Sequence, residues 1–302
     1  MRLPGEQIAE MNRAEVAWRL LAPWGMTPET AELERHAVYT FRGQWAEQWR
    51  IGRALLAGDA AHLMPPFAGQ GLCSGMRDSI ALAWCLDAIL RGIGREDLLD
   101  SYGPERSAHV QELIAFSIEL GKVICIADPE VARQRDINMV AAQAQPGYRP
   151  PPPPQPRLGP GLWSSEAAGG GLLGVQSEIE IDGRRGLFDD LIGVRFAVLA
   201  RDSAMLRSVS DENLLALAYW NAALVGFSPD QVRDVTGRYG QWLDQLGCEA
   251  AFVRPDFYLQ GGARNGAELN ALLDDWRRQV TAGGSQSPTR VLEPDSSQLQ
   301  VS

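Results

Sequence analysis

The sequence predicts an α/β protein that is divided into two blocks. Short apolar or alternating runs typical of strands recur along the chain, and longer runs with helical spacing lie between them. A stretch rich in proline and glycine separates the two halves. At roughly 150 residues per domain, the 302 residues provide for two domains. Apolar residues at 45% and charged residues at 22% are typical of a folded globular protein, so a collagen-like, coiled-coil or wholly disordered chain is excluded.

The first block should begin with short elements. Helical spacing of apolar residues predicts a helix over residues 10–21. Thr27 followed by Pro28 is typical of a helix N-terminus, so we expect a second short helix there. Residues 36–41 alternate and are rich in Val, Tyr, Thr and Phe, which predicts a half-buried strand. The apolar run 54–57 predicts a strand that is buried on both faces.

Two long helices complete the first block. The first should span residues 72–91 and end near Gly92. Its predicted buried face consists of Leu72, Met76, Ile80, Ala83, Trp84 and Ala88. The second should span residues 105–125. Its predicted buried face consists of Val110, Leu113, Ile114 and Ser117.

The second block is predicted to be a small α/β sandwich, because strand and helix patterns alternate in it. The strands are expected over residues 193–200, 250–253 and 257–259, and the helices over 212–223, 239–246 and 267–280. The proline run suits a stiff linker better than a ligand for an SH3-like partner. The expected divisions are a first domain over 1–147, a linker over 148–174, a second domain over 175–282 and a disordered tail over 283–302.

Charge and hydropathy exclude several kinds of partner. The 28 Lys and Arg against 38 Asp and Glu give a net charge of −10, which repels phosphate backbones and anionic membrane surfaces. We therefore expect no nucleic-acid and no membrane partner. No run approaches the ~20 apolar residues of a membrane-spanning helix, and the first residues lack a signal-peptide core. The expected location is the cytoplasm.

Cysteine and histidine spacing excludes the common metal and redox sites. The four cysteines form no C-x-x-C pair, so we expect them to be small buried hydrophobic residues. The three histidines show no H-x-x-x-H spacing, so we expect no metal site. Any chemistry is then expected to depend on an organic cofactor.

The informative stretch is residues 52–78. A strand should deliver Gly58 and Asp59 to its carboxyl end, where ligands of open α/β sheets bind and a carboxylate can accept bonds from ligand hydroxyls. Gly69 and Gly71 should let backbone amides approach a ligand where a helix begins, a position that favours negative charge. Many α/β proteins contain such elements without a site, so these residues leave a functional and a structural interpretation open.

The same stretch closely resembles the second flavin-contacting motif of the FAD-dependent aromatic hydroxylases, the single-component flavoprotein monooxygenases. The matching residues are Gly52, Arg53, Gly58, Asp59, Ala60, Ala61, His62, Pro65, Pro66, Gly69, Gln70, Gly71, Gly75 and Asp78. Downstream, a Y-x-x-E-R motif of the same family is matched by Tyr102, Glu105 and Arg106. Residues 3–6, 20–25 and 39–41 make the chain most similar to the meta-hydroxyphenylpropionate hydroxylases.

The resemblance covers residues 1–140 and resumes over 186–258. It implies the C-terminal portion of a Rossmann-like FAD-binding hydroxylase domain, followed by a thioredoxin-like α/β domain without redox cysteines. No G-x-G-x-x-G turn and no Asp-Gly motif of the family precedes Gly52. We therefore expect Met1 to correspond to an interior residue of longer family members, and the FAD diphosphate and adenine to lack contacts in this chain.

The resemblance implies a role for each motif residue. Asp59 would bind the ribityl hydroxyls of FAD, and backbone amides near Gly71 and Leu72 would face the pyrimidine edge of the isoalloxazine. The other expected FAD contacts are Gly58, Pro66, Gly69 and Gln70. His62 is expected to be structural.

The substrate side is less defined, and no catalytic residue is identified. The loop over residues 65–69 would border the aromatic substrate, with Pro66 as a candidate contact. Tyr39 and His36 are further candidates, because residues 36–41 reach the substrate region in this family. Tyr39 and Phe41 share one face of the predicted strand, and we expect both to pack in the core.

The reaction that the resemblance implies is hydroxylation of a phenolic acid with O2 and NADH or NADPH, with FAD supplying the chemistry. A homodimer is a candidate assembly. Two hypotheses follow. In the first, the chain is a truncated aromatic hydroxylase, or works with a separately supplied segment. In the second, it is a non-catalytic remnant that acts through association of its thioredoxin-like domain.

Overall fold

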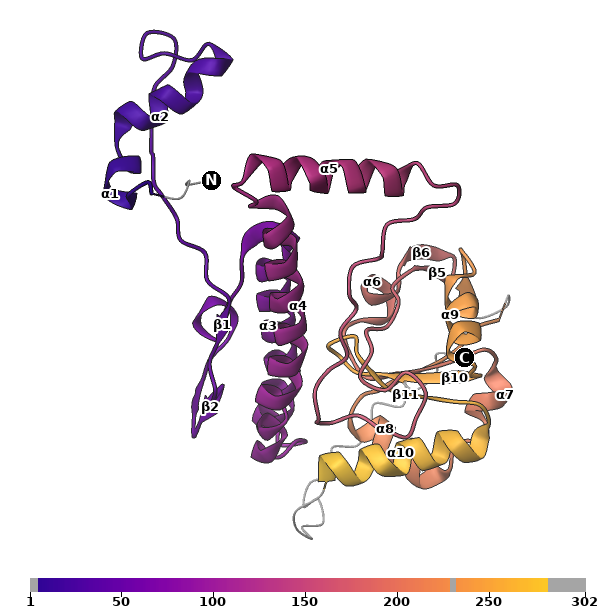
Figure 1. Cartoon of the computed structure of the whole chain (residues 1–302). Helices are drawn as coiled ribbons and strands as arrows, with labels where there is room; N and C mark the ends of the chain where they lie inside the picture. Colours follow the sequence, from indigo (N-terminus) through magenta and orange to yellow (C-terminus); the bar gives the residue numbers. More distant parts are fainter. Residues whose placement is uncertain (1–4, 229–231, 282–302) are drawn as a thin grey trace. The chain divides into compact units, whose positions relative to one another are not determined.

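The computed structural model describes residues 5–228 and 232–281 (Figure 1). The tail predicted over residues 283–302 lies outside this range. The chain divides into two compact units, each made of several segments. The first unit comprises Met1–Gln44, Leu63–Gly71 and Leu113–Pro154, and the second comprises Trp45–His62, Leu72–Glu112 and Gln155–Ser302. No helix in the described ranges is long and apolar enough to cross a membrane.

The N-terminal segment of the first unit has little regular structure. The helix predicted over residues 10–21 is present as two pieces, α1 (Ile8–Met11) and α2 (Ala14–Leu21). The helix predicted at Thr27 is wrong: the backbone N–H of Thr27 donates to Thr30 Oγ1 at 2.9 Å in a single turn. The strand predicted over residues 36–41 is also wrong, because this segment pairs with no strand among the described residues. The first unit also contains α5 (Pro129–Gln143), which Asp128 caps and which the sequence patterns did not predict.

Two long helices confirm the periodicity of the first block. They are α3 (Gln70–Leu90) and α4 (Tyr102–Ile124). The predicted face of α4 is buried along its whole length. On α3, Trp84 and Ala88 are buried as predicted, but Leu72 and Met76 are 77% and 64% exposed. The prediction is therefore wrong for those two residues, because no described residue covers the first turns of α3 on that side. It is also wrong for Ala83, which is exposed.

The strand predicted over residues 54–57 is much reduced. It survives as β3 (Ala54–Leu55), which pairs antiparallel with β2 (Arg50–Ile51). Ala54 is exposed and Leu55 is only half-buried, so the predicted burial on both faces is wrong. Two further short strands, β1 (Gln44–Trp45) and β4 (His62–Leu63), form another two-stranded pair.

The C-terminal part of the second unit is the predicted α/β sandwich (Figure 1). Its four-stranded sheet has the order β11-β10-β7-β8, in which β7 and β8 are parallel and the other pairs are antiparallel. The strands are β7 (Ala197–Ala200), β8 (Ala223–Gly226), β10 (Ala250–Val253) and β11 (Leu259–Ala263). The helices that accompany it are α6 (Phe188–Ile192), α7 (Ser203–Leu206), α8 (Asp211–Tyr219), α9 (Arg238–Leu246) and α10 (Gly266–Thr281).

Alternation along the central strands creates two apolar cores, one on each face of the sheet. Val198 and Phe252 face a cluster that includes Trp276 of α10. Leu199 and Ala251 face a second cluster around α9. A three-stranded sheet, β6-β5-β9, contributes to the second cluster. Its strands are β5 (Glu178–Ile181), β6 (Arg184–Leu187) and β9 (Val232–Asp234).

The proline- and glycine-rich stretch is not a spacer along its whole length. Leu158 is 3% exposed. Gly159 lies against α4, and its backbone N–H donates to the carbonyl of Glu105 at 3.0 Å. A Cβ on Gly161 would lie 2.1 Å from Glu105 Oε1. The second half of this stretch is therefore part of the packed second unit, and glycine is what permits its approach to α4.

We expect Gly161→Ala to destabilise the second unit by about 1–3 kcal/mol, because the added methyl group overpacks a contact with a buried carboxylate. Gly240→Ala is the matched control: no atom lies within 4 Å of its added Cβ, and Gly240 is inside α9. Alanine is the better helix former there, so the control should be neutral or slightly stabilising. Urea unfolding measures both; equal stability of the two variants would contradict the packing.

Candidate functional site

The turn at Gly58 and Asp59 packs against α3. A 3-10 turn, η2 (Gly58–Ala60), follows β3, and Gly58 has a φ of +57°, which favours glycine. A Cβ on Gly75 of α3 would lie 3.3 Å from the Cα of Gly58. Paired glycines thus bring the backbone of the turn directly onto the second helical turn of α3.

Asp59 differs from the buried acidic residue of this motif, Asp78, because its carboxylate has no partner among the described residues. Its side chain is exposed. The cost of burying a charge is therefore not incurred, and the carboxylate remains available to accept bonds from ligand hydroxyl groups.

The first turn of α3 supplies backbone donors. The amides of Gly71 and Leu72 donate to no group within the described part of the chain. Such amides, at the positive end of the helix dipole, favour a ligand with an anionic edge. Gln70 is the first residue of α3. Gly71 has room beside it, since a Cβ added there would lie 3.7 Å from Met64 Cγ, an ordinary van der Waals distance.

The loop before α3 is held within the first unit. Residues Pro66–Ala68 form a 3-10 turn, η3, and Gly69 ends it with a φ of +64°. Ser117 of α4 donates to the carbonyl of Pro65 at 2.6 Å, and its Oγ accepts the N–H of Ala68 at 3.4 Å. Serine on the buried face of α4 therefore fixes the conformation of this loop.

The substrate-side candidates of the first unit are open to solvent. His36 and Tyr39 are exposed, Tyr39 by 62%, and the guanidinium of Arg35 lies 5.9 Å from the Tyr39 ring centroid. The expectation that Tyr39 and Phe41 pack in a core is wrong, since Phe41 is also 56% exposed. The rings of Phe41 and Phe67 do meet edge to face, with centroids 6.4 Å apart. Phe67 is an aromatic neighbour of this loop that the motif analysis did not single out.

Asp78 is the buried centre beneath the turn. Its side chain is fully buried and accepts three bonds: from the N–H of Gly58 at 3.0 Å, from His62 Nε2 at 2.8 Å and from Arg106 Nε at 2.9 Å. Burial alone would raise the pKa of Asp78, but the His62 bond, the Arg106 charge and the Gly58 N–H together hold that pKa below its usual range. The carboxylate therefore stays ionised and fixes the turn to α3 and α4.

The Y-x-x-E-R residues lie on one face of α4 and have separate partners. The hydroxyl of Tyr102 donates to the carbonyl of Leu56, just before the turn, at 2.9 Å. The carboxylate of Glu105 accepts hydrogen bonds from both Nη atoms of Arg254, at 2.9 and 2.8 Å. Arg106 binds Asp78. The motif thus stabilises the strand, the turn and the C-terminal domain from a single helix.

Sequence reasoning missed the C-terminal members of this cluster. Arg254, Asp256 and Tyr258 are each 1–2% exposed and alternate along the turn after β10. Asp256 binds Arg254 at 3.0 and 2.6 Å and accepts the indole N–H of Trp84 at 3.3 Å. The available signal was the placement of two charged residues between predicted strands, which is unusual unless they are paired in the interior.

The cysteine prediction is half right. Cys85 and Cys248 are buried, whereas Cys73 and Cys125 are exposed. Burial raises the pKa of the Cys248 thiol above its usual range, so this cysteine is a poor nucleophile.

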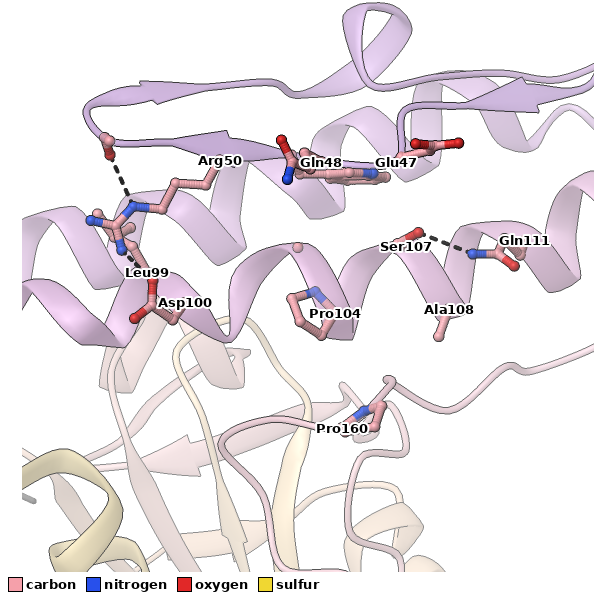
Figure 2. A pocket seen from close by; sticks show the side chains of 13 residues that line it. Glu47, Gln48, Arg50, Leu99, Asp100, Pro104, Ser107, Ala108, Gln111 and Pro160 are labelled. Atoms are coloured by element: carbon pink, nitrogen blue, oxygen red, sulfur yellow. Dashed lines mark hydrogen bonds and ion pairs between the residues drawn. The ribbon is translucent and has the colours of Figure 1, made fainter.

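The second unit also has an open pocket of about 690 Å³ (Figure 2). Figure 2 shows Glu47, Gln48 and Arg50 across from α4, where Ser107 and Gln111 are joined by a 3.0 Å hydrogen bond. Arg50 is already paired with Glu96 and Asp100. Of the motif residues only Gly52 lines this pocket, and none of the predicted FAD contacts does.

We expect Asp78→Asn to lower the free energy of unfolding by about 3–5 kcal/mol, because it leaves the buried Arg106 charge without its counter-ion. Asp87→Asn is the matched control on the same helix, since Asp87 forms an exposed pair with Arg91 at 3.2 Å. That variant should lose less than about 1 kcal/mol. Urea denaturation followed by circular dichroism measures both, and similar losses would refute the role of Asp78.

Acid stability should depend on His109. Burial, together with the nearby charges of Arg106 and Arg77, lowers the pKa of His109 to about 3. Between pH about 6.5 and 3 the unfolded chain therefore takes up a proton that the folded chain refuses, so stability falls as pH falls. His109→Gln keeps an acceptor but removes this titration. Its unfolding free energy should decline less steeply below pH 6, by up to about 1.4 kcal/mol per pH unit; parallel pH profiles would contradict this.

Both parts of the chain resemble known proteins. Residues 4–117 match the family model of an FAD binding domain, and residues 171–279 match the HcaD C-terminal domain. A probable NADH-specific resorcinol 4-hydroxylase of Rhodococcus jostii (strain RHA1) is 38% identical over 288 residues, which are 92% of this chain and 53% of the relative. A 3-(3-hydroxy-phenyl)propionate/3-hydroxycinnamic acid hydroxylase of Mycolicibacterium gilvum (strain PYR-GCK) is 35% identical, covering 84% and 49% of the two chains.

A solved structure shares the fold. Aklavinone-11 hydroxylase, crystallised with FAD and aklavinone, superimposes with a TM-score of 0.64 at 22% identity, over 91% of this chain and 52% of that one. The chain thus spans about half the length of the curated relatives it matches. The chain therefore matches an FAD binding domain and an HcaD C-terminal domain, and it is similar to FAD-dependent aromatic hydroxylases over about half of their length.

Proposed function

We propose that this chain is the part of an aromatic hydroxylase that contacts the ribityl chain and the pyrimidine edge of FAD. The observation that carries the proposal is the contrast within one motif: Asp78 is saturated with protein partners, whereas the Asp59 carboxylate and the Gly71 and Leu72 amides have none among the described residues. Unpaired acceptor and donor groups of this kind suit a ligand with hydroxyl groups and an anionic edge.

Each group has a role in this proposal. Asp59 would accept hydrogen bonds from the ribityl hydroxyls. Gly58 adopts the positive φ that the turn carrying Asp59 requires. The amides of Gly71 and Leu72 would stabilise negative charge on the reduced ring, because donors fixed in place require no reorganisation when that charge develops. Pro66, Gly69 and Gln70 would border the ring from the preceding loop.

The proposed reaction is hydroxylation of a phenolic aromatic acid. Bound FAD would supply the redox chemistry, taking a hydride from NADH or NADPH and using O2 to hydroxylate the ring. The protein would orient the ring, exclude water and stabilise charge. The resorcinol and hydroxyphenylpropionate hydroxylases among the relatives support a phenolic substrate, and the NADH-specific one supports NADH as the reductant. Complete activity would require the half of the relatives that this chain does not span.

The second proposal is a non-catalytic association domain. The exposed positions of His36 and Tyr39 favour it over autonomous turnover, because they leave the substrate side unformed within the first unit. The colour of the purified protein separates the two proposals: the first requires FAD to bind, and the second requires a colourless protein that does not respond to FAD.

Asp59→Ala should weaken FAD binding by about 10- to 100-fold, the effect of losing charge-assisted hydrogen bonds to a ligand. The measurement is quenching of flavin fluorescence on titration, with the chain alone and together with the N-terminal half of a relative. Asp87→Ala is the control, an exposed aspartate of the same unit that lies outside the motif. Equal FAD affinity of the Asp59 variant and the wild type would refute the assigned contact.

A further inference from the structure

The turn between β10 and β11 places three buried polar side chains against the flavin motif. Its residues Arg254, Asp256 and Tyr258 are buried, with exposed fractions of 1–2%. Arg254 binds Glu105, and Tyr258 binds Arg106 and His109. Glu105 and Arg106 precede His109 by four and three residues, so the three lie on one face of α4. Asp256 binds Arg254. Polar side chains of the turn are thus hydrogen-bonded to polar side chains of α4.

Several backbone hydrogen bonds fix the conformation of this turn. Phe257 has a φ of +68°, a strained conformation for a bulky residue. Its N–H donates to the carbonyl of Arg254 at 2.9 Å, and its carbonyl accepts the N–H of Gly174 at 2.7 Å. The N–H of Arg254 donates to the carbonyl of Tyr258 at 2.8 Å. The side chains that face α4 therefore start from a fixed backbone.

Tyr258 connects this turn to the centre of the motif. Its hydroxyl accepts Arg106 Nη1 at 3.3 Å and bonds to His109 Nε2 at 2.9 Å. Because the Tyr258 oxygen accepts from arginine, its single proton can be donated to His109, in the neutral tautomer whose Nε2 carries no proton. Arg106 in turn binds Asp78, and Asp78 binds the N–H of Gly58. We call this chain of four residues, Tyr258, Arg106, Asp78 and Gly58, the Asp78 relay.

We propose that the C-terminal domain positions the flavin-contacting turn through the Asp78 relay, which makes Tyr258 a positioning residue for FAD binding. Arg106 is fully buried, so its guanidinium can take few orientations once Tyr258 and Asp78 are both bound. Without the hydroxyl of Tyr258, the guanidinium loses one of its fixed points, and Asp78 then holds Gly58 less firmly. The functional half of this inference rests on the proposed FAD contact of Asp59.

Hydrogen–deuterium exchange of the full chain tests the relay directly. In Tyr258→Phe we expect amides of residues 57–62 to exchange about 10-fold faster, while amides of β7 keep their protection. Tyr239→Phe is the matched control: Tyr239 is also 1% exposed and in the same domain, but its hydroxyl accepts the N–H of Ser177 at 3.2 Å, outside the relay. This control should leave residues 57–62 unchanged.

The functional readout is FAD affinity, titrated with the chain and the N-terminal half of a relative. Tyr258→Phe should raise the dissociation constant by about 5- to 10-fold, and Tyr239→Phe should not change it. Unchanged exchange at residues 57–62 in a folded Tyr258→Phe protein overturns the relay. Faster exchange with no FAD binding by any form, wild type included, supports the relay and overturns the proposed function instead.

A second pair of variants changes His109, the other hydrogen-bond partner of the Tyr258 hydroxyl, and keeps the test possible if Tyr258→Phe does not fold. His109→Gln keeps an acceptor for the Tyr258 proton, whereas His109→Leu removes it. Without that acceptor the hydroxyl rotates more freely, and its hydrogen bond from Arg106 is weakened. The proposal requires faster exchange at residues 57–62 in the leucine variant than in the glutamine variant. Equal exchange in the two folded variants overturns it.

Discussion

The structure depends on one buried carboxylate. Asp78 accepts bonds from a backbone amide, an imidazole and a guanidinium, and it reaches each of them directly. Because an ion in the interior is tolerated only when its partners are complete, the positions of Gly58, His62 and Arg106 are fixed relative to one another. Because Gly58 directly precedes Asp59, its bond to Asp78 also fixes the position of the turn that carries Asp59.

The motif therefore contains two kinds of polar group with opposite uses. Groups below the turn are buried and paired, and they determine where the turn lies. The Asp59 carboxylate and the first amides of α3 are unpaired among the described residues and remain available. A binding site needs both, since free groups discriminate a ligand only when their support does not move with it.

The C-terminal domain has a structural part in this arrangement. The single cysteine of residues 175–281, Cys248, is buried, and burial raises its thiol pKa, which makes it a poor nucleophile. The domain contributes charged groups. Arg254 donates hydrogen bonds to Glu105, and Asp256 accepts hydrogen bonds from Arg254 and from the indole N–H of Trp84. The packed stretch around Gly161 adds the backbone N–H of Leu162 to the same Glu105 carboxylate, at 2.5 Å. The two predicted domains thus share a polar interior within the second unit.

The sequence by itself determined the long helices, the C-terminal sandwich and the motif, because these depend on local periodicity and on residue types at fixed spacing. The Asp182–Gly183 pair, whose residue types favour a two-residue hairpin turn, connects β5 and β6, and both residues have positive φ. Only the tertiary structure decided that residues 36–41 form no strand and that β3 is short, because a strand needs partner edges that no local pattern reveals. It alone paired Glu105 with Arg254 and Arg106 with Tyr258, since charges far apart in sequence become partners only where folding removes them from water.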